Sequence, residues 1–170
     1  MPSASKIKGS SFEREIAKYL SDRYNESFIR VPNSGAYVGG SNKGRKEVLH
    51  EGQVRSFKGD IIPGVSFPLL NIECKNYGDF PFHQLLTNCK VLNGWLQQLL
   101  DVSDEHDLNV LFMKFNHKGR YIAVQDTVKW DVPSYMVYKS PDYGVWIISE
   151  LDTFFTLNSG IFKKHSQVSN

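Results

Sequence analysis

Charged residues interrupt two short apolar segments near the middle of the chain. Residues 59–64 read Gly-Asp-Ile-Ile-Pro-Gly, and residues 69–75 read Leu-Leu-Asn-Ile-Glu-Cys-Lys. Both segments are predicted to be strands that bring Asp60, Glu73 and Lys75 to one place. A strand directs successive side chains to opposite faces, so Glu73 and Lys75 share a face while Ile72 and Cys74 face the core. Because burial of an unpaired charge is costly, these charged side chains require a binding partner.

The hydrophobic pattern elsewhere predicts helices and further strands. Apolar residues recur at helical spacing from about residue 11 to residue 24, and a second, broader stripe over residues 81–102 would cover the sheet. His83 and Gln84, in the first turn of that second helix, either face Lys75 or are ordinary helix residues. Ser149 is a candidate cap for a short helix over residues 150–157 that ends near Gly160. Further strands are predicted at residues 27–31, 109–115, 120–124, 134–139 and 144–148.

Composition describes an ordinary globular chain. Its 170 residues suit one domain, and 41% are apolar while 22% are charged. No run approaches the ~18 apolar residues that span a membrane. The first residues lack the apolar core of a signal peptide, so an intracellular location is expected, in the host cytoplasm if the source is viral. Cys74 and Cys89 have no zinc-type spacing and are predicted to be reduced core thiols.

The charge distribution is more informative than the net charge of +2. Residues 1–60 carry 11 Lys/Arg against 7 Asp/Glu, a basic excess compatible with a local phosphate-binding face. Residues 36–58 form the least regular stretch and are expected to be a long loop or a small hairpin beside the site. This stretch is either a clamp on a DNA backbone or a plain solvated loop. Its basic residues are Lys43, Arg45, Lys46, Arg55 and Lys58.

Asp60, Glu73 and Lys75 have the side chains that phosphodiester hydrolysis requires. Hard divalent cations prefer carboxylate oxygens and keep several waters. Such a cation polarises a phosphodiester and lowers the pKa of an attacking water. The Lys75 ammonium can orient that water or neutralise charge on the phosphate. The tripeptide E-x-K is common, however, and on a surface strand Glu73 and Lys75 would be no more than solvated neighbours.

The order of these pieces resembles the archaeal-type Holliday junction resolvases of the PD-(D/E)XK nuclease superfamily. The matching pieces are residues 8–15 (Lys-Gly-Ser-Ser-Phe-Glu-Arg-Glu), Arg30-Val31 with Asn33-Ser34-Gly35, residues 59–62 and residues 72–75. The resemblance covers about residues 6–125. It implies an α/β (α+β) fold in which a mixed central β-sheet is flanked by helices, as in restriction endonucleases. Residues 1–170 would be a single nuclease domain with a core at about 6–125, a basic loop insertion at about 36–58 and a C-terminal extension at about 130–170.

The resemblance also assigns roles by position. Glu13, Asp60 and Glu73 are implied to be the acidic metal-site residues, and Lys75 the catalytic lysine. Glu13 would act on a second metal or through a water, and Ser34 would lie near the scissile phosphate. Simpler roles stay open for both of these residues: Glu13 as an acid that stabilises the first turn of its helix, and Ser34 as a turn former. The implied cofactor is Mg²⁺, for which Mn²⁺ can substitute.

Two features depart from the resolvase pattern. The superfamily's usual proline before the aspartate is Gly59 here, a change expected to leave the carboxylate in place. About 25 residues separate Ser34 from Asp60, whereas compact resolvases have a much shorter connection. The extra segment would grip one arm of a branched DNA or recognise something else.

The resemblance implies a magnesium-dependent endonuclease that cleaves branched DNA, above all four-way junctions, and leaves a 5′-phosphate. Because a four-way junction has two-fold symmetry, a C2 homodimer is expected. Two alternatives stay open: a restriction- or repair-type endonuclease on the same fold, and a non-catalytic DNA-binding relative. The candidate DNA contacts are Lys8, Arg14, Arg30, Lys43, Arg45, Lys46, Arg55 and Lys58.

Overall fold

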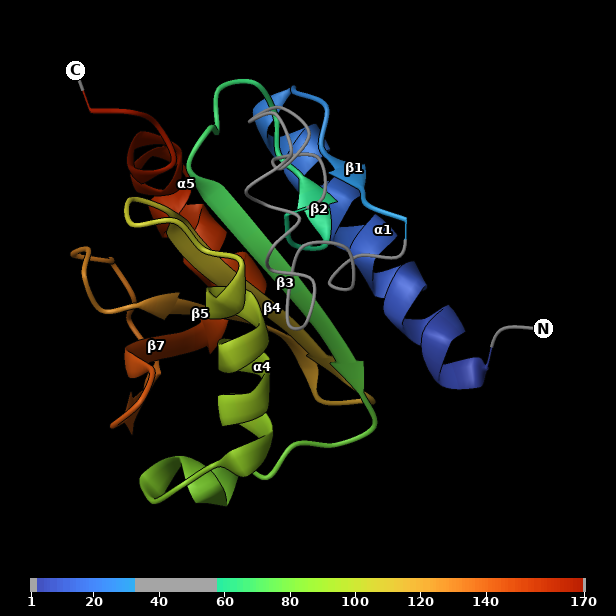
Figure 1. The fold of residues 1–170 in the computed structure, drawn as a ribbon, viewed down its shortest axis with the longest axis vertical. Helices are drawn as coiled ribbons and strands as arrows, with labels where there is room; N and C mark the ends of the chain where they lie inside the picture. The colour runs from blue at the N-terminus through green and yellow to red at the C-terminus, as the bar shows by residue number, and fades with distance from the viewer. Residues whose placement is uncertain (1–2, 33–57, 170) are drawn as a thin grey trace.

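The computed structural model describes residues 3–32 and 58–169, and the predicted basic loop therefore lies almost wholly outside the described residues. The helices are α1 (Ala4–Tyr24), α4 (Lys90–Asp101), α5 (Leu151–His165) and the 3₁₀ helix η2 (Phe82–Leu86). The strands, drawn in Figure 1, are β1 (Ile29–Arg30), β2 (Ile61–Ile62), β3 (Leu70–Tyr77), β4 (Leu108–Phe115), β5 (Gly119–Gln125), β6 (Met136–Ser140) and β7 (Gly144–Glu150).

Within the described residues, one mixed sheet organises the fold. Its order is β3-β4-β5-β7-β6, and β3 runs parallel to β4 while each later neighbour is antiparallel. A small antiparallel pair, β1 with β2, lies beside α1 in Figure 1. The register aligns Glu73 with Leu111 and Lys75 with Met113. Among the strands that the structure describes, only β4 pairs with β3 in this sheet, so the charged residues of β3 lie at an edge of it.

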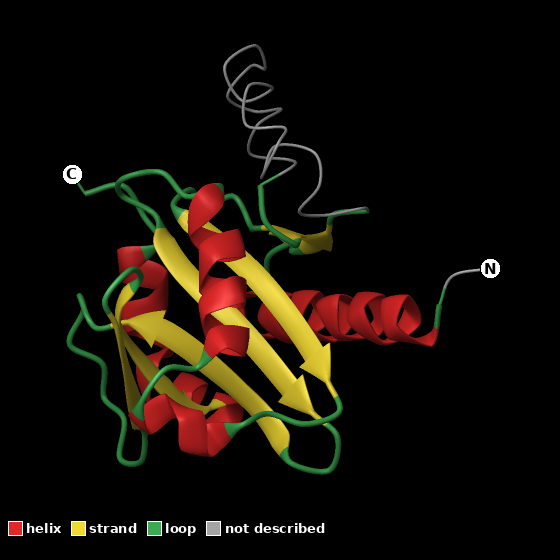
Figure 2. Ribbon diagram, turned by 60° about the horizontal axis from the view of Figure 1, so that its bottom comes forward, coloured by secondary structure: helices red, strands yellow, loops and turns green. Residues whose placement is uncertain are grey.

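Helices cover both faces of this sheet, as Figure 2 shows. On one face, Phe12 and Ile16 of α1 join Phe154 and Phe155 of α5 in a cluster with Ile72 and other strand residues. On the other face, α4 packs Leu92, Trp95 and Leu96 against the alternate strand residues. The two clusters follow from the period of two along each strand. The predicted fold, a mixed central sheet flanked by helices, is confirmed.

Three predicted helices have boundaries that differ from those in the structure. Helix α1 begins at Ala4, where the Ser3 side chain accepts a hydrogen bond from the Lys6 N–H. Glu13 is therefore in the third turn of α1 and not in the first, so it lies away from the positive end of the helix dipole. The helix predicted over 81–102 is divided into η2 and α4. Helix α5 is capped by Glu150, not Ser149, and it continues through the position predicted to end it.

None of the helices in the described part of the chain is long and apolar enough to cross a membrane.

Candidate nuclease site

The segment before β2 runs along the free edge of β3 and places Asp60 there. The Asp60 N–H donates to the carbonyl oxygen of Ile72 at 2.8 Å, and the Val31 N–H donates to the Asp60 carbonyl at 2.9 Å. The Asp60 side chain is 4% exposed, and its Oδ2 accepts the N–H of Cys74 at 2.7 Å. The backbone of β3 thus holds Asp60 beside Glu73 and Lys75.

Gly59 is required by this arrangement. Its φ is +66°, and a Cβ built on it would lie 2.4 Å from the carbonyl oxygen of Ile72. Proline holds φ near −65° and has no N–H, so the proline usual in the superfamily cannot occupy this position without a shift of the backbone. The glycine does leave the Asp60 carboxylate in place, as predicted, and its conformation allows the close approach of the segment to β3.

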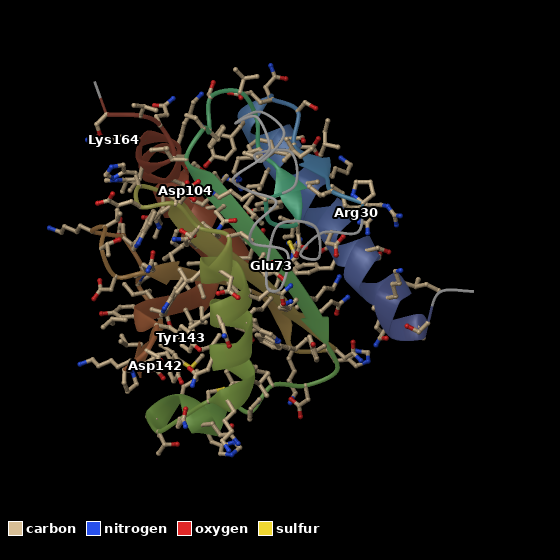
Figure 3. The ribbon with its side chains drawn as sticks, in the orientation of Figure 1. Arg30, Glu73, Asp104, Asp142, Tyr143 and Lys164 are labelled. Carbon is tan, nitrogen blue, oxygen red and sulfur yellow. The ribbon has the colours of Figure 1, made fainter. Side chains whose placement is uncertain are left out.

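Glu73 and Lys75 lie on the same face of β3, as the alternation predicted. Figure 3 shows Glu73 on this strand. The Glu73 side chain is only 2% exposed, and its Oε1 accepts a hydrogen bond from Lys75 Nζ at 2.6 Å. Lys75 Nζ also donates to Gln98 Oε1 of α4 at 2.7 Å. Glu73 is therefore a buried carboxyl group in direct contact with Lys75, and the two residues are not solvated neighbours on a surface strand.

Glu13 reaches the same region from α1. Its Oε2 accepts a hydrogen bond from Arg30 Nε of β1, and both side chains are largely shielded from solvent. Arg30, predicted to contact a DNA backbone, thus neutralises a buried acid in this structure. Cys74, on the opposite side of β3 from Glu73, packs in the core as a free thiol.

The three carboxylates act on one another electrostatically. Burial raises the pKa of Glu73 to about 8, with Asp60 and Glu13 adding to the rise and Lys75 opposing it. Burial also raises the pKa of Glu13, with Asp60 adding to the rise and Arg30 and Lys75 opposing it. Carboxyl groups whose pKa values are raised by burial and by one another would be stabilised in their ionised form by a bound cation.

The same residues line an open cleft of about 530 Å³ between the start of α1, β3 and α4. Its wall includes Lys8 on α1, Tyr77 at the end of β3 and Gln98 on α4. Asn76 Nδ2 donates to the Lys8 carbonyl at 3.1 Å, which ties the first turns of α1 to the end of β3. Glu13, Asp60, Glu73 and Lys75 all line this cleft, so the structure brings the four together.

The predicted DNA contacts divide into three groups. Lys8 is exposed at the cleft, and Arg14 is exposed on α1. Arg30 and Lys58 are paired with acids: Lys58 Nζ contacts Asp104 at 2.9 Å and also Asp107, and its side chain is 11% exposed. The third group lies outside the described residues and consists of Lys43, Arg45, Lys46 and Arg55. Ser34, predicted to be catalytic, also lies outside the described residues.

The donor set fits a divalent metal of the magnesium type. Within residues 3–32 and 58–169, no group of three or more His, Cys, Asp or Glu side chains is arranged to hold a metal ion. Mg²⁺, however, is usually bound through one or two carboxylates, several waters and substrate phosphate oxygens. Asp60 and Glu73 supply that pair of hard oxygen donors, while Arg30 engages Glu13.

Gln98 is the functional candidate that the sequence did not reveal. The sequence left open whether His83 and Gln84 face Lys75 or are ordinary helix residues, and the structure places His83 in a different cavity with Asp79 and Lys118. Gln98 reaches Lys75 because α4 crosses β3, a contact between residues 23 positions apart. Its only signal in the sequence is one of several polar positions on an amphipathic helix, which is too common to select it.

The fold is a mixed sheet flanked by helices, and two carboxyl groups and a lysine lie at its edge strand. This arrangement is consistent with the PD-(D/E)XK nuclease fold. The model of a family described as "Phage putative PDDEXK endonuclease" matches residues 4–160. The chain belongs to this family and is a nuclease of the PD-(D/E)XK superfamily. The superfamily prediction is thereby confirmed, while the narrower resemblance to Holliday junction resolvases stays a prediction. No curated protein and no solved structure matches the chain.

Proposed function

We propose that the protein is a magnesium-dependent endonuclease that cleaves phosphodiesters in branched DNA, with the four-way junction as its substrate. The observation that carries the proposal is the buried set of Asp60, Glu73 and Lys75 at the floor of an open cleft. A structural ion pair would need only one acid for Lys75. The second buried carboxylate, Asp60, adds to the raised pKa of Glu73, and carboxyl groups that perturb one another in this way are common at functional sites.

In this proposal Asp60 and Glu73 hold the metal, and Mn²⁺ can replace Mg²⁺. When bound, such an ion neutralises developing charge on the phosphate and lowers the pKa of an attacking water. The Cys74 N–H donates to Asp60 Oδ2 and so fixes the orientation of the carboxyl group. Glu13, held by Arg30, would contribute through a water or a second metal.

Lys75 has a separate role in this proposal. Its ammonium, held between Glu73 and Gln98, orients the attacking water or stabilises charge on the phosphate. The water oxygen forms a bond to phosphorus in line with the leaving 3′-oxygen. The P–O3′ bond breaks, so the products carry a 5′-phosphate and a 3′-hydroxyl, and a proton is released to solvent.

Support for branched DNA as the substrate comes from the motif order, which resembles that of junction resolvases. Such enzymes recognise shape and phosphate rather than base sequence, so binding should weaken steeply with salt. Lys8 at the cleft and Arg14 on α1 are the described candidates for phosphate contacts. The paired cuts that resolve a two-fold symmetric junction also lead us to propose a homodimer.

The proposal is tested by comparing Asp60→Asn and Lys75→Ala with wild-type protein on a labelled four-way junction. Each change should lower the cleavage rate at least ~100-fold, since several kcal/mol of transition-state stabilisation are lost. Junction affinity should stay within a few-fold of wild type. The matched control is Asp142→Asn, an exposed acid far from Glu73 in Figure 3, which should cut normally. Full activity in Asp60→Asn protein would refute the site.

A further inference from the structure

Tyr77 is an exposed aromatic residue inside the candidate cleft. It follows Glu73 and Lys75 at intervals of two residues on β3, so the three side chains share one face of the strand. Tyr77 is 48% exposed although it lines the same cleft as the acids. At a rise of ~3.3 Å per residue, its Cα lies about 7 Å beyond that of Lys75 along the strand.

A buried aromatic group supports this exposed ring from behind. The Tyr77 and Trp95 ring centroids are 4.9 Å apart with a 43° interplanar angle. Trp95 is 6% exposed and stacks with Phe80 at 5.6 Å and with Phe115 at 6.4 Å. The Tyr77 ring therefore rests on a packed cluster, and little side-chain entropy remains to be lost when a ligand contacts its open side.

Helix α4 holds Tyr77 and Lys75 in a fixed relation. Trp95 and Gln98 are three residues apart and lie on one face of α4. Trp95 contacts Tyr77, and Gln98 accepts a hydrogen bond from Lys75. The positions of Tyr77 and Lys75 on β3 are thus both fixed by contacts with one turn of α4. An aromatic surface at a defined distance from the catalytic lysine suits a ligand that carries a phosphate and a flat ring.

We propose that Tyr77 is a stacking platform for an unpaired base next to the phosphate that is cut. The inference rests on the proposed function and narrows its substrate to branched DNA that has an unpaired base, which a fully paired four-way junction offers only where a base pair at its branch point opens. Every base has a π-face, so stacking on tyrosine needs no particular sequence. In an intact duplex the bases are already stacked on their neighbours, and only a strand with an unpaired nucleotide can offer one to Tyr77 without unstacking. Lys8, on the opposite wall of the cleft, provides positive charge for the backbone of that strand.

A purely structural role for Tyr77 makes different predictions. If the ring only covers Trp95, its removal lowers stability and affects all DNA substrates equally. A platform predicts an effect confined to DNA with an unpaired base near the cut, together with full rescue by phenylalanine. These two readouts separate the roles.

The experiment measures binding and cleavage with two DNAs of the same sequence. One is a linear duplex, and the other carries unpaired nucleotides at a branch, one of them the fluorescent adenine analogue 2-aminopurine. Wild type is compared with Tyr77→Ala, Tyr77→Phe and Tyr135→Ala. Tyr135 is the matched control because it is 52% exposed but lies before β6, at the opposite edge of the sheet from β3. Thermal melting confirms that each variant is folded.

We expect Tyr77→Ala to weaken binding of the branched DNA about 5- to 100-fold, the range that a stacked base contributes. Its affinity for the duplex should change less than twofold. Quenching of 2-aminopurine should be present with wild type and Tyr77→Phe and lost with Tyr77→Ala. Tyr135→Ala should match wild type throughout.

Three results would overturn the platform: equal effects on both DNAs, no effect of Tyr77→Ala, or failure of Tyr77→Phe to restore binding. The binding measurements need no hydrolysis. Absence of cleavage by wild-type protein would therefore reject the proposed nuclease function, while the binding and quenching data would still decide the role of Tyr77.

Discussion

The replacement Glu73→Gln tests whether the buried carboxyl holds a proton in the metal-free protein. Glu73 is 2% exposed, and burial beside Asp60 raises its pKa from an ordinary 4.5 to about 8. Glutamine has the shape of the protonated acid and does not ionise. The difference in unfolding free energy between wild type and variant therefore reports the ionisation of Glu73 together with its coupling to Asp60, Lys75 and Glu13.

The sign of the effect follows from proton binding. Between pH 4.5 and about 8 the unfolded carboxyl is ionised while the folded one still holds its proton, so the folded state binds more protons. The stabilisation that the protonated Glu73 contributes is complete below pH 4.5 and is lost as the pH rises through the pKa of Glu73 in the folded protein. The slope is about 1.4 kcal/mol per pH unit. Relative to Glu73→Gln, wild type should lose roughly 4 kcal/mol of stability between pH 5 and pH 8.

The assay is urea denaturation followed by tryptophan fluorescence, in buffer that contains EDTA, at half-unit steps of pH. Glu105→Gln, which changes an exposed glutamate in the loop after α4, is the matched control and should parallel wild type. A difference between wild type and Glu73→Gln that stays constant within about 0.5 kcal/mol from pH 5 to pH 8 would show that Glu73 is ionised throughout. The electrostatic description of the site would then be wrong.

Two further predictions concern residues that position the site. Gly59→Ala should destabilise the protein by at least ~1 kcal/mol more than Gly144→Ala. Both glycines have positive φ, but only at Gly59 would the added methyl group lie 2.4 Å from a backbone atom. Equal losses of stability in urea denaturation would contradict the close contact. Gln98→Ala should lower kcat about fivefold at unchanged KM, because Lys75 loses a hydrogen-bond acceptor worth about 1 kcal/mol. Gln97→Ala, the exposed neighbour, should leave kcat unchanged, and an equal drop in both variants would refute a specific role for Gln98.

Strand alternation predicted the central part of the site correctly. Glu73 and Lys75 share a face and Ile72 and Cys74 are in the core, because β3 is a regular strand whose side chains must alternate. The pairing of Asp60 with this strand also followed from its place in a short apolar segment.

Other features depend on contacts that a local pattern does not contain. The first two turns of α1 are largely exposed, so they have no apolar stripe to mark the true helix start at Ala4. The break between η2 and α4 is stabilised at Cys89, whose N–H donates to the Tyr138 hydroxyl of β6 at 3.1 Å. Gln98 is placed by the crossing of α4 over β3. Each of these is decided by the packing of distant elements.

The most direct test of the nuclease proposal is cleavage of a labelled four-way junction beside a linear duplex of matched sequence, with magnesium and with EDTA. Wild-type protein should make symmetric, magnesium-dependent nicks in the junction and leave the duplex intact, and Glu73→Gln should bind the junction without cutting it. Equal cutting of both DNAs would contradict the branched substrate. Binding without cleavage at every magnesium and manganese concentration would contradict the nuclease mechanism itself.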